Sequence, residues 1–451
     1  MFSKRQPARA RASEGPFVSV LDIGTSCIKA LVCELRHGKA SVVGVAKEGL
    51  GERAPFSAAG GFALAPQLLT SLCDLNLRRA EDMTPPFCGH KVVPDQVAIG
   101  VGANMLRGFS TTLQVQRVRP AGRVVEEELT TLLQRIQRLA WGQIMESAVP
   151  VEPPRASTEG TRPITLPAIR RVRERGSWTL VNSAVAEVQV DGLRVADPLR
   201  LQGKTIQATV FNAFIPTWHR DILASLAADL ELELTHLIAE PFAVSLAVPA
   251  GDAIFLDLGA DRTDIALVRN GGVIATASLP QGGRDLSRQI ANRLSLTFDK
   301  AEESKLQRDQ GGFALLAKPL TRAGRRAQSQ DPVAEAMGGS LAAWLDGLEQ
   351  LLIRMAGHEP LPSRIMLCGG GCQSPDVAAA LRAPVWIRRL PFVRPPELEQ
   401  IPPRDVRNLV DRTQHLLSPQ DVPVMALAAR AAAKGYPETL QDKLLLAVVG
   451  A

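Results

Sequence analysis

The chain has 451 residues, too many for one ordinary hydrophobic core, so we expect two to four domains. Hydrophobic residues make up 45% of the chain and charged residues 22%, which is normal for a globular protein. The net charge is +6, but aromatic residues make up only 4%, too few for the stacking surfaces of a nucleic-acid-binding protein, so we expect no nucleic-acid partner.

Residues 1–15 form a basic tail that we expect to be disordered, and no apolar signal core follows it. No apolar run approaches the roughly 20 residues of a membrane span. The six cysteines follow neither a disulfide framework nor a zinc-site spacing. We therefore expect a cytoplasmic protein.

The first informative stretch is Phe17–Leu31, in which a mostly apolar run ends on Asp22. The polar turn Gly24-Thr25-Ser26 follows, and the chain then returns to apolar residues with Lys29 among them. Gly24 lets the backbone approach a ligand because it has no Cβ, and successive N–H groups in such a turn form a concave anion site. Asp22 is well placed to hold a hydrated divalent cation. An ordinary β-hairpin fits this stretch equally well.

The middle of the chain predicts a small module within a larger α/β domain. After a helix over Ala65–Ala80, the stretch Phe109–Lys204 is predicted to be strand–helix–strand–strand. The expected ranges are Phe109–Val118, Val124–Ala140, Trp178–Val190 and Thr205–Ile215, with Val149–Ser177 as a long Pro- and Arg-rich loop. A helix over Trp218–Leu230 should follow.

Ala239–Val248 is predicted to be a short helix of small apolar residues that packs between two layers. Pro241 suits the first helical turn, where its missing N–H costs nothing. Glu240 would point into a cleft, although an acid at a helix start is also favoured by the helix dipole alone.

A second hairpin of the same type lies at Ala253–Val268, with Asp257 and Gly259 at its turn. Gly282-Gly283 then opens a helix, and the next helix carries Glu302 and Lys305 on one face. A third turn, at Arg364–Ser374, runs from an apolar strand into the glycines Gly369, Gly370 and Gly371. Two Asp-x-Gly hairpins and a strand–triple-glycine turn indicate two similar lobes that clamp one phosphorylated ligand.

The C-terminal stretch Thr439–Ala451 is apolar with a single lysine, Lys443. Its Leu and Val residues would suit a helix lying in the lipid interface, but the cationic face common to such helices is missing. A helix packed back on the body of the protein is an equal alternative.

In the order of these turns the sequence resembles the actin, sugar-kinase and heat-shock-chaperone superfamily of ATPases. The inserted module, the segment Asp191–Pro216, the stretch Ser278–Leu294 and the segment FDKAEESK at Phe298–Lys305 make it more similar to the FtsA family of actin-like bacterial cell-division proteins. The resemblance extends from about Phe17 to Ala433. It implies an α/β, actin-like two-lobed ATPase fold with an inserted strand–helix–strand–strand subdomain of the SHS2 type.

The resemblance also implies a division of the chain. We expect a tail at 1–15, the first part of lobe 1 at 16–104, the inserted subdomain at 105–204, the second part of lobe 1 at 205–250, lobe 2 with the nucleotide-binding turns at 251–390, a return to lobe 1 at 391–438, and a C-terminal anchor helix at 439–451.

By position, the resemblance assigns a role to each residue of the three turns and their surroundings. Asp22 and Asp257 would hold Mg²⁺ through water, Glu240 would orient a water near the γ-phosphate, and Glu302 and Lys305 would lie beside the base and ribose. The other expected ATP-binding residues are Gly24, Thr25, Ser26, Lys29, Gly259, Ala260, Arg262, Gly282, Gly283, Gly369, Gly370 and Gly371.

The second turn departs from the family pattern Asp-x-Gly-Gly-Gly-Thr, because Ala260, Asp261 and Arg262 follow Gly259. Losing two glycines costs about 1–2 kcal/mol per residue if those positions need left-handed dihedrals. Asp261 would repel a phosphate by about 4 kcal/mol at 4 Å and an effective dielectric of 20, and Arg262 offsets this only if it points inward. We expect weak nucleotide binding, similar affinities for ADP and ATP, and at most a weak ATPase.

What the resemblance implies is a scaffold that binds ATP as a conformational ligand, self-associates into filaments or dimers, and links the tubulin-like division ring to the cytoplasmic membrane. It would sit at the inner face of the membrane at the division site. A PilM-type pilus-assembly actin is the alternative, since that family shares the lobes and the inserted module. A small-molecule kinase would need an Asp base facing a substrate pocket, and no candidate stands out.

Overall fold

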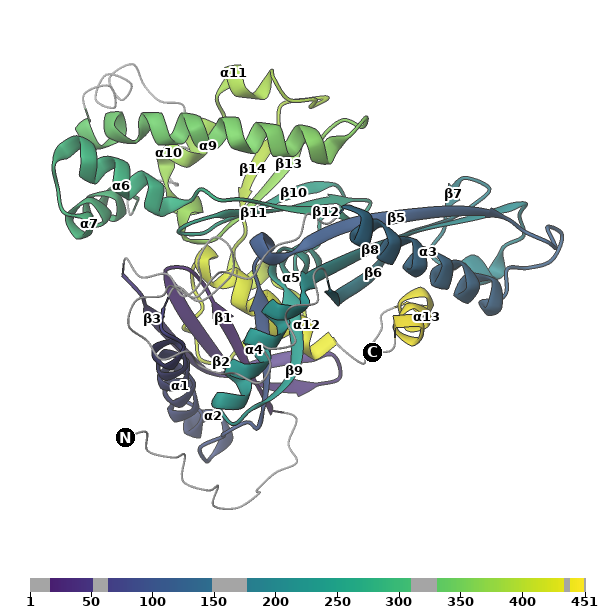
Figure 1. Ribbon diagram of the computed structural model, residues 1–451, viewed down its shortest axis with the longest axis horizontal. Helices are drawn as coiled ribbons and strands as arrows, with labels where there is room; N and C mark the ends of the chain where they lie inside the picture. The colour runs from purple at the N-terminus through teal and green to yellow at the C-terminus, as the bar shows by residue number, and fades with distance from the viewer. Residues whose placement is uncertain (1–16, 52–63, 148–176, 310–330, 434–438, 450–451) are drawn as a thin grey trace.

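The computed structural model describes residues 17–51, 64–147, 177–309, 331–433 and 439–449. In them, two lobes lie one above the other and a long arm projects from their junction (Figure 1). The expected basic tail at 1–15 and most of the loop at 149–177 lie outside the described residues.

Lobe 1 is built on a six-stranded sheet in the order β15-β3-β2-β1-β4-β9. The first hairpin pairs β1 with β2 in antiparallel register, whereas β4 runs parallel to β1 and β9 runs parallel to β4. The strands are β1 (Phe17–Ile23), β2 (Cys27–Arg36), β3 (Lys39–Gly49), β4 (Gln96–Val101), β9 (Glu233–Ala239) and β15 (Leu409–Asp411); the helices are α1 (Pro66–Asp82), α2 (Pro85–Cys88), α4 (Thr217–Asp229), α5 (Glu240–Ala247) and α12 (Val422–Ala433).

Lobe 2 repeats this pattern. Its second hairpin pairs β10 with β11 in antiparallel register, β12 continues the meander, and β13 and then β14 add in parallel beyond β10. The strands are β10 (Ala253–Leu258), β11 (Thr263–Arg269), β12 (Gly272–Leu279), β13 (Arg364–Cys368) and β14 (Glu397–Gln400); the helices are α6 (Gly283–Leu294), α7 (Phe298–Asp309), α9 (Pro332–Ala356), α10 (Pro375–Leu381) and α11 (Pro384–Ile387). The predicted two similar lobes are therefore confirmed.

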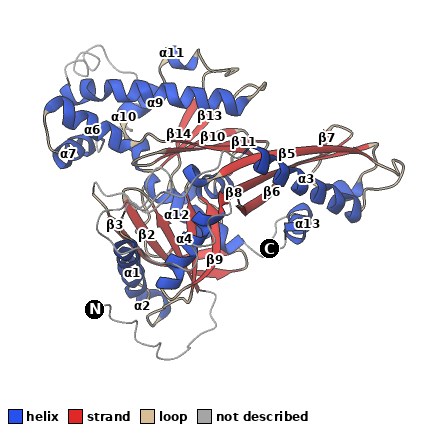
Figure 2. Cartoon of the chain, viewed as in Figure 1, coloured by secondary structure: helices blue, strands red, loops and turns tan. Residues whose placement is uncertain are grey.

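The arm is the inserted subdomain, and its strands extend the lobe 2 sheet in the order β12-β5-β8-β6-β7, as Figure 2 shows. It consists of β5 (Arg107–Gln116), α3 (Glu126–Ser147), β6 (Trp178–Val190), β7 (Leu193–Arg194) and β8 (Thr205–Pro216). Because β8 pairs with both β5 and β6, the subdomain continues past residue 204, where we expected it to end. Similarly, β14 still belongs to lobe 2, so the return to lobe 1 comes later than residue 391.

The largest apolar core is centred on lobe 1 and extends to residues of the lobe 2 sheet such as Phe255 and Val268, and lobe 2 and the arm have further cores. The lobe 1 core includes Val20, Leu31 and Phe242, and the lobe 2 core includes Leu256, Leu348 and Trp386. In the arm, Leu129, Leu132, Leu133 and Ile136 of α3 are buried against the sheet as the helical period predicts. Leu139 is 46% exposed, because the 3.6-residue period brings Ala140 and Ile144 to the buried face instead.

The C-terminal helix α13 (Leu440–Val449) lies beside the arm in Figure 1. It packs against α3 and β6, where Leu445 is buried in the core of the arm and Leu444, Val448 and Val449 pack around it. The Gln441 side chain also donates a hydrogen bond of 2.6 Å to the Ala196 carbonyl. Of the two alternatives for this stretch, the structure has the helix packed on the body of the protein, so its apolar face is not presented as an anchor.

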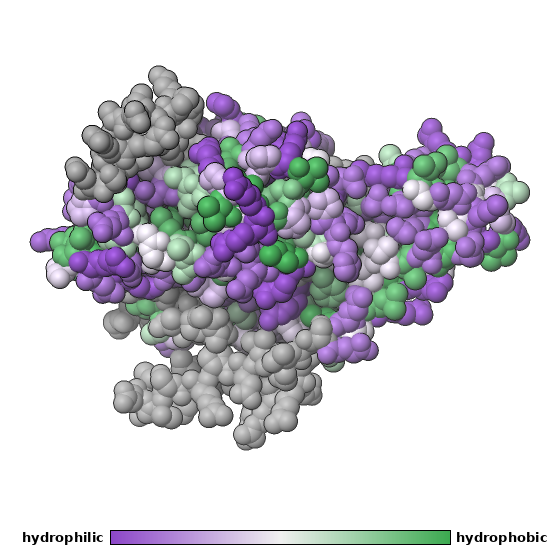
Figure 3. Space-filling model, turned by 90° about the horizontal axis from the view of Figure 1, so that it is seen from above, coloured by the Kyte–Doolittle hydropathy of each residue, from purple (hydrophilic) through white to green (hydrophobic). Residues whose placement is uncertain are grey.

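In the described part of the chain, no helix is both long and apolar enough to cross a membrane. Seen from above, the described residues show hydrophilic and hydrophobic side chains interspersed over that face (Figure 3).

Candidate functional site

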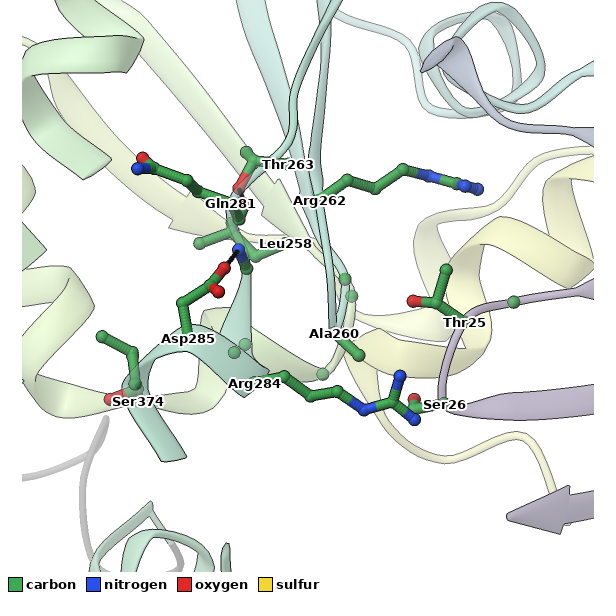
Figure 4. Close-up of a pocket in the computed structure, with 18 of the residues that line it drawn as sticks. Thr25, Ser26, Leu258, Ala260, Arg262, Thr263, Gln281, Arg284, Asp285 and Ser374 are labelled. Atoms are coloured by element: carbon green, nitrogen blue, oxygen red, sulfur yellow. Dashed lines mark hydrogen bonds between the residues drawn. The ribbon is translucent and has the colours of Figure 1, made fainter. Parts of the chain in front are cut away.

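The three predicted turns line one cleft of about 870 Å³ between the lobes. The backbone N–H of Asp261 in the second turn donates a hydrogen bond of 3.3 Å to the Thr25 hydroxyl in the first, so the two turns face each other. Figure 4 shows Thr25 and Ser26 opposite Ala260 across this space. The volume is within the range of about 300–1,000 Å³ that small-molecule sites occupy.

Strand pairing sets the first two turns. The β1–β2 register runs to the pair Ile23–Ile28, and the β10–β11 register runs to Leu258–Thr263, so four residues connect the paired strands of each hairpin. A Cβ at Gly24 would lie 2.9 Å from the Cys27 carbonyl oxygen, so this turn requires glycine. Neither Ala260 nor Asp261 is among the residues with positive φ, so the conformational cost that we considered for the missing glycines is not incurred.

The triple-glycine turn comes after β13, which lies parallel to β10 with Cys368 opposite Asp257. Gly369 has φ of +82°, and a Cβ there would come within 2.2 Å of the Asp257 Oδ1 and 2.6 Å of the Leu258 carbonyl oxygen. Glycine is therefore required for the close approach of the third turn to the second.

At the floor of the cleft, Lys29 is held by the protein itself. Its Nζ donates hydrogen bonds of 2.9 Å to the Asp22 carboxylate and 2.8 Å to the Gln420 carbonyl. Burial lowers the pKa of Lys29, but the adjacent Asp22 carboxylate outweighs it, so the pKa lies above its ordinary value. The expected phosphate contact of Lys29 would thus compete with its ion pair to Asp22.

Arg262, labelled in Figure 4, is paired with Glu240 of lobe 1 and with Asp264, so it does not offset the Asp261 charge as we considered. Its Nη2 lies 3.5 Å from the Glu240 carboxylate and its Nε lies 3.3 Å from the Asp264 carboxylate. The Gly102 backbone packs against the guanidinium, since a Cβ there would be 1.9 Å from Nη2. Asp264 also accepts hydrogen bonds from the Ala103 N–H at 2.9 Å and the Ser278 hydroxyl at 2.6 Å.

Two carboxyl groups of the cleft have raised pKa values. Burial is the main cause for Glu240, whose pKa is raised to about 8; the Asp22 charge raises it further, and Arg262 opposes the shift. Burial is also the main cause for Asp257, whose pKa is raised to about 7; Asp264 adds to the shift and Lys29 opposes it. A largely protonated Glu240 paired with Arg262 is a poor group for activating water.

The charge of Asp261 is neutralised by residues of α6. Arg284 donates a hydrogen bond of 2.6 Å to its Oδ2, and Arg288 lies 3.5 Å from its Oδ1. The Arg284 side chain is buried and also contacts the Gly51 carbonyl of lobe 1. Figure 4 shows it reaching across the cleft toward Ser26. Sequence reasoning missed Arg284, because it follows a Gly-Gly pair without any motif of its own.

The helix α6 begins directly on the second turn. The N–H groups of Gly283 and Arg284 donate to the Gly259 and Ala260 carbonyls at 3.0 and 2.7 Å, and Gly282 leaves no room for a Cβ beside these carbonyls. On the next helix, Lys305 donates to Glu302 at 2.8 Å and to the Gly283 carbonyl at 3.0 Å. Glu302 and Lys305 thus line the cleft as expected, as a pair.

Two buried polar atoms of the cleft have no hydrogen-bond partner among the described residues, namely the Ser374 Oγ and the Gln281 Oε1. Buried polar groups are nearly always hydrogen-bonded, so these atoms are available to a polar ligand. Ser374 follows the triple-glycine turn and Gln281 precedes Gly282, and neither had a sequence signal beyond this position.

The expected Mg²⁺ fits these residues poorly. Asp22 is already paired with Lys29, and Glu240 and Asp264 are already paired with Arg262. Within the described ranges, no group of three or more His, Cys, Asp or Glu side chains is arranged to hold a metal ion. Asp22 and Asp257 lie together as predicted, but their surroundings are not those of a free carboxylate site.

No family model matches the chain. It is 23% identical over 383 residues to the cell division protein FtsA of Pseudomonas aeruginosa, covering 80% of this chain and 79% of that protein. It is 22% identical over 376 residues to the cell division protein FtsA of Bacillus subtilis, covering 79% and 74% of the two chains. Among solved structures, the PilM–PilN type IV pilus biogenesis complex matches with a TM-score of 0.57 and 17% identity, covering 92% of this chain and 98% of that chain.

The duplicated sheets, the arm inserted in lobe 1 and the similarity to FtsA along most of both chains agree with one another. We conclude that the chain has the actin-like fold and is similar in sequence to the FtsA proteins along most of its length.

Proposed function

We propose that this chain is an actin-like, nucleotide-binding scaffold of bacterial cell division. It would link a tubulin-like division-ring protein to the inner face of the cytoplasmic membrane at the division site and associate with itself. The observation that carries this proposal is the convergence of three glycine turns on one cleft, in a chain similar to FtsA over about four-fifths of its length.

The ligand that fits the cleft best is an adenine nucleotide. Its phosphates would lie between Thr25 and Ser26 of lobe 1 and the second turn of lobe 2. The adenosine would pack on Gly369–Gly371, where the unpartnered Ser374 hydroxyl is available. Because such a ligand contacts both lobes, it would set the angle between them, which is the role of a conformational ligand.

Hydrolysis should be slow. Glu240, the expected water-orienting residue, has a raised pKa and lies 3.5 Å from Arg262. A base with this protonation state and this partner would contribute little to the attack of water at neutral pH. We therefore assign ATP mainly a binding role.

A PilM-type role in pilus assembly is the second candidate, and the fold match to the PilM–PilN complex favours it. The packing of α13 on the arm also favours it, because a membrane link through α13 would first require this helix to detach.

A pull-down of the full chain from its native cells distinguishes the two candidates. Recovery of the tubulin-like division protein, together with loss of that protein from the septum when the chain is depleted, supports the cell-division role. Recovery of pilus-assembly proteins without the division protein would replace it with the second. Calorimetry with ADP and ATP tests the nucleotide site itself, and no binding of either would contradict it.

A further inference from the structure

Arg262 occupies a central position among the acidic groups of the cleft. It enters from the second turn, and its guanidinium lies between Glu240 on α5 and Asp264 on β11. Its charge also acts on Asp257 and Asp22, the two residues expected to face the metal ion. Because a guanidinium is not deprotonated in proteins, this positive charge is permanent.

The guanidinium is fixed in place by packing as well as by charge. The Gly102 backbone packs so closely on the guanidinium that no Cβ would fit between them. The Arg262 side chain is only 16% exposed. Asp264 is fixed in turn by the Ala103 N–H at 2.9 Å and the Ser278 hydroxyl at 2.6 Å. Moving Arg262 aside would therefore remove the cation that lies beside the buried Glu240 and Asp264.

From this arrangement we infer that Arg262 takes the electrostatic place of a divalent cation, so that the cleft binds its nucleotide without requiring Mg²⁺. Lys29 contributes in the same way, since it neutralises Asp22 at 2.9 Å. A divalent ion placed near Asp22 and Asp257 would meet two protein-held cations already there, which repel it. The inference rests on the proposed nucleotide site and specifies its cofactor dependence.

The test is a titration of the full chain with ADP and with ATP by calorimetry, once with excess Mg²⁺ and once with EDTA. For the natural chain we expect affinities that differ by less than about threefold between the two buffers, since the cation that balances the phosphates is part of the protein. A loss of about tenfold or more in EDTA overturns the inference. An absence of binding in both buffers overturns the proposed nucleotide site and the inference with it.

Arg262→Met keeps the length of the side chain and removes its charge. We expect this variant to bind about tenfold more weakly in EDTA and to recover part of that loss with Mg²⁺. Arg262→Lys retains the positive charge, so its affinity should lie nearer that of the natural chain. Arg354→Met is the control, because Arg354 is exposed on α9 and does not line the cleft. Equal affinities of the Arg262→Met variant and the natural chain in EDTA would overturn the inference. If Arg262→Met does not fold, the two-buffer comparison on the natural chain and Arg262→Lys still decides it.

Discussion

The sharpest test of the cleft geometry is Gly369→Ala. In its left-handed conformation, an alanine costs about 1–2 kcal/mol. The new Cβ would also lie 2.2 Å from the Asp257 Oδ1 and 2.6 Å from the Leu258 carbonyl oxygen, and the latter belongs to β10 and cannot rotate away. Such overpacking adds about 1–3 kcal/mol. We expect the variant to lose about 2–5 kcal/mol of unfolding free energy in lobe 2 and to lose nucleotide binding.

The assay is urea unfolding followed by tryptophan fluorescence, since Trp344 and Trp386 are buried in the lobe 2 core. Gly338→Ala is a matched control in the same lobe. Gly338 lies within α9 with no atom near its absent Cβ, so alanine should stabilise the helix by about 1 kcal/mol. The reasoning fails if Gly369→Ala costs less than about 1 kcal/mol, or if the two substitutions shift the midpoint in the same direction.

Three further predictions concern charge and packing. The pKa of Glu240 is raised from 4.5 to about 8 and that of Asp257 from 3.8 to about 7, so the folded state is stabilised when these groups are protonated. The free energy of unfolding should therefore fall as the pH rises from about 4 to 8. A flat pH profile would contradict the burial of these groups. Arg284→Ala leaves Asp261 without its 2.6 Å partner, so ATP should lose more affinity than ADP in calorimetry, and an equal loss would show that Asp261 does not face the terminal phosphate. Leu445→Asp places a charge in the core of the arm and should release α13. Amide hydrogen exchange should then be faster in α13 and α3 and unchanged in the cores of the two lobes. Unchanged exchange in α13 would refute its docking through Leu445.

Much of the fold could be predicted from hydrophobic period and turn chemistry. The hairpin turns at Gly24 and Gly259 were found because an apolar run ends on an Asp followed by glycine, which is a local pattern. The helix α3 was found because its apolar residues recur at helical spacing. The continuity of β12 with β5 could not be predicted, because strands from two segments more than a hundred residues apart meet at one register pair, Ala275–Phe109.

The partners of charged side chains were harder to predict. The direction of Arg262 depends on the missing side chain of Gly102, whose place the guanidinium takes, and that glycine lies far from Arg262 in the sequence. Arg284 was missed for the same reason, since its contact with Asp261 depends on how α6 docks on the second turn. The sequence therefore indicated which residues line the cleft, but not which of them are already paired with one another.

The arm belongs to lobe 1 by chain order but shares a sheet with lobe 2, and this has a mechanical consequence. At the seam, one register pair, Ala275–Phe109, joins its strands to lobe 2, and the Ser110 hydroxyl adds a hydrogen bond of 3.1 Å to the Val273 carbonyl. The Asn182 side chain ties the arm to lobe 1 by accepting from the Ala239 N–H at 2.7 Å, next to Glu240. The seam residue Phe109 is level with Ser183 of β6, and seven residues separate Ser183 from the end of β6 at Val190. At about 3.4 Å per residue this stretch spans about 24 Å, so a rotation of about 10° at the seam would displace the tip by about 4 Å. Small changes of interlobe angle would therefore be amplified at the distal end of the arm.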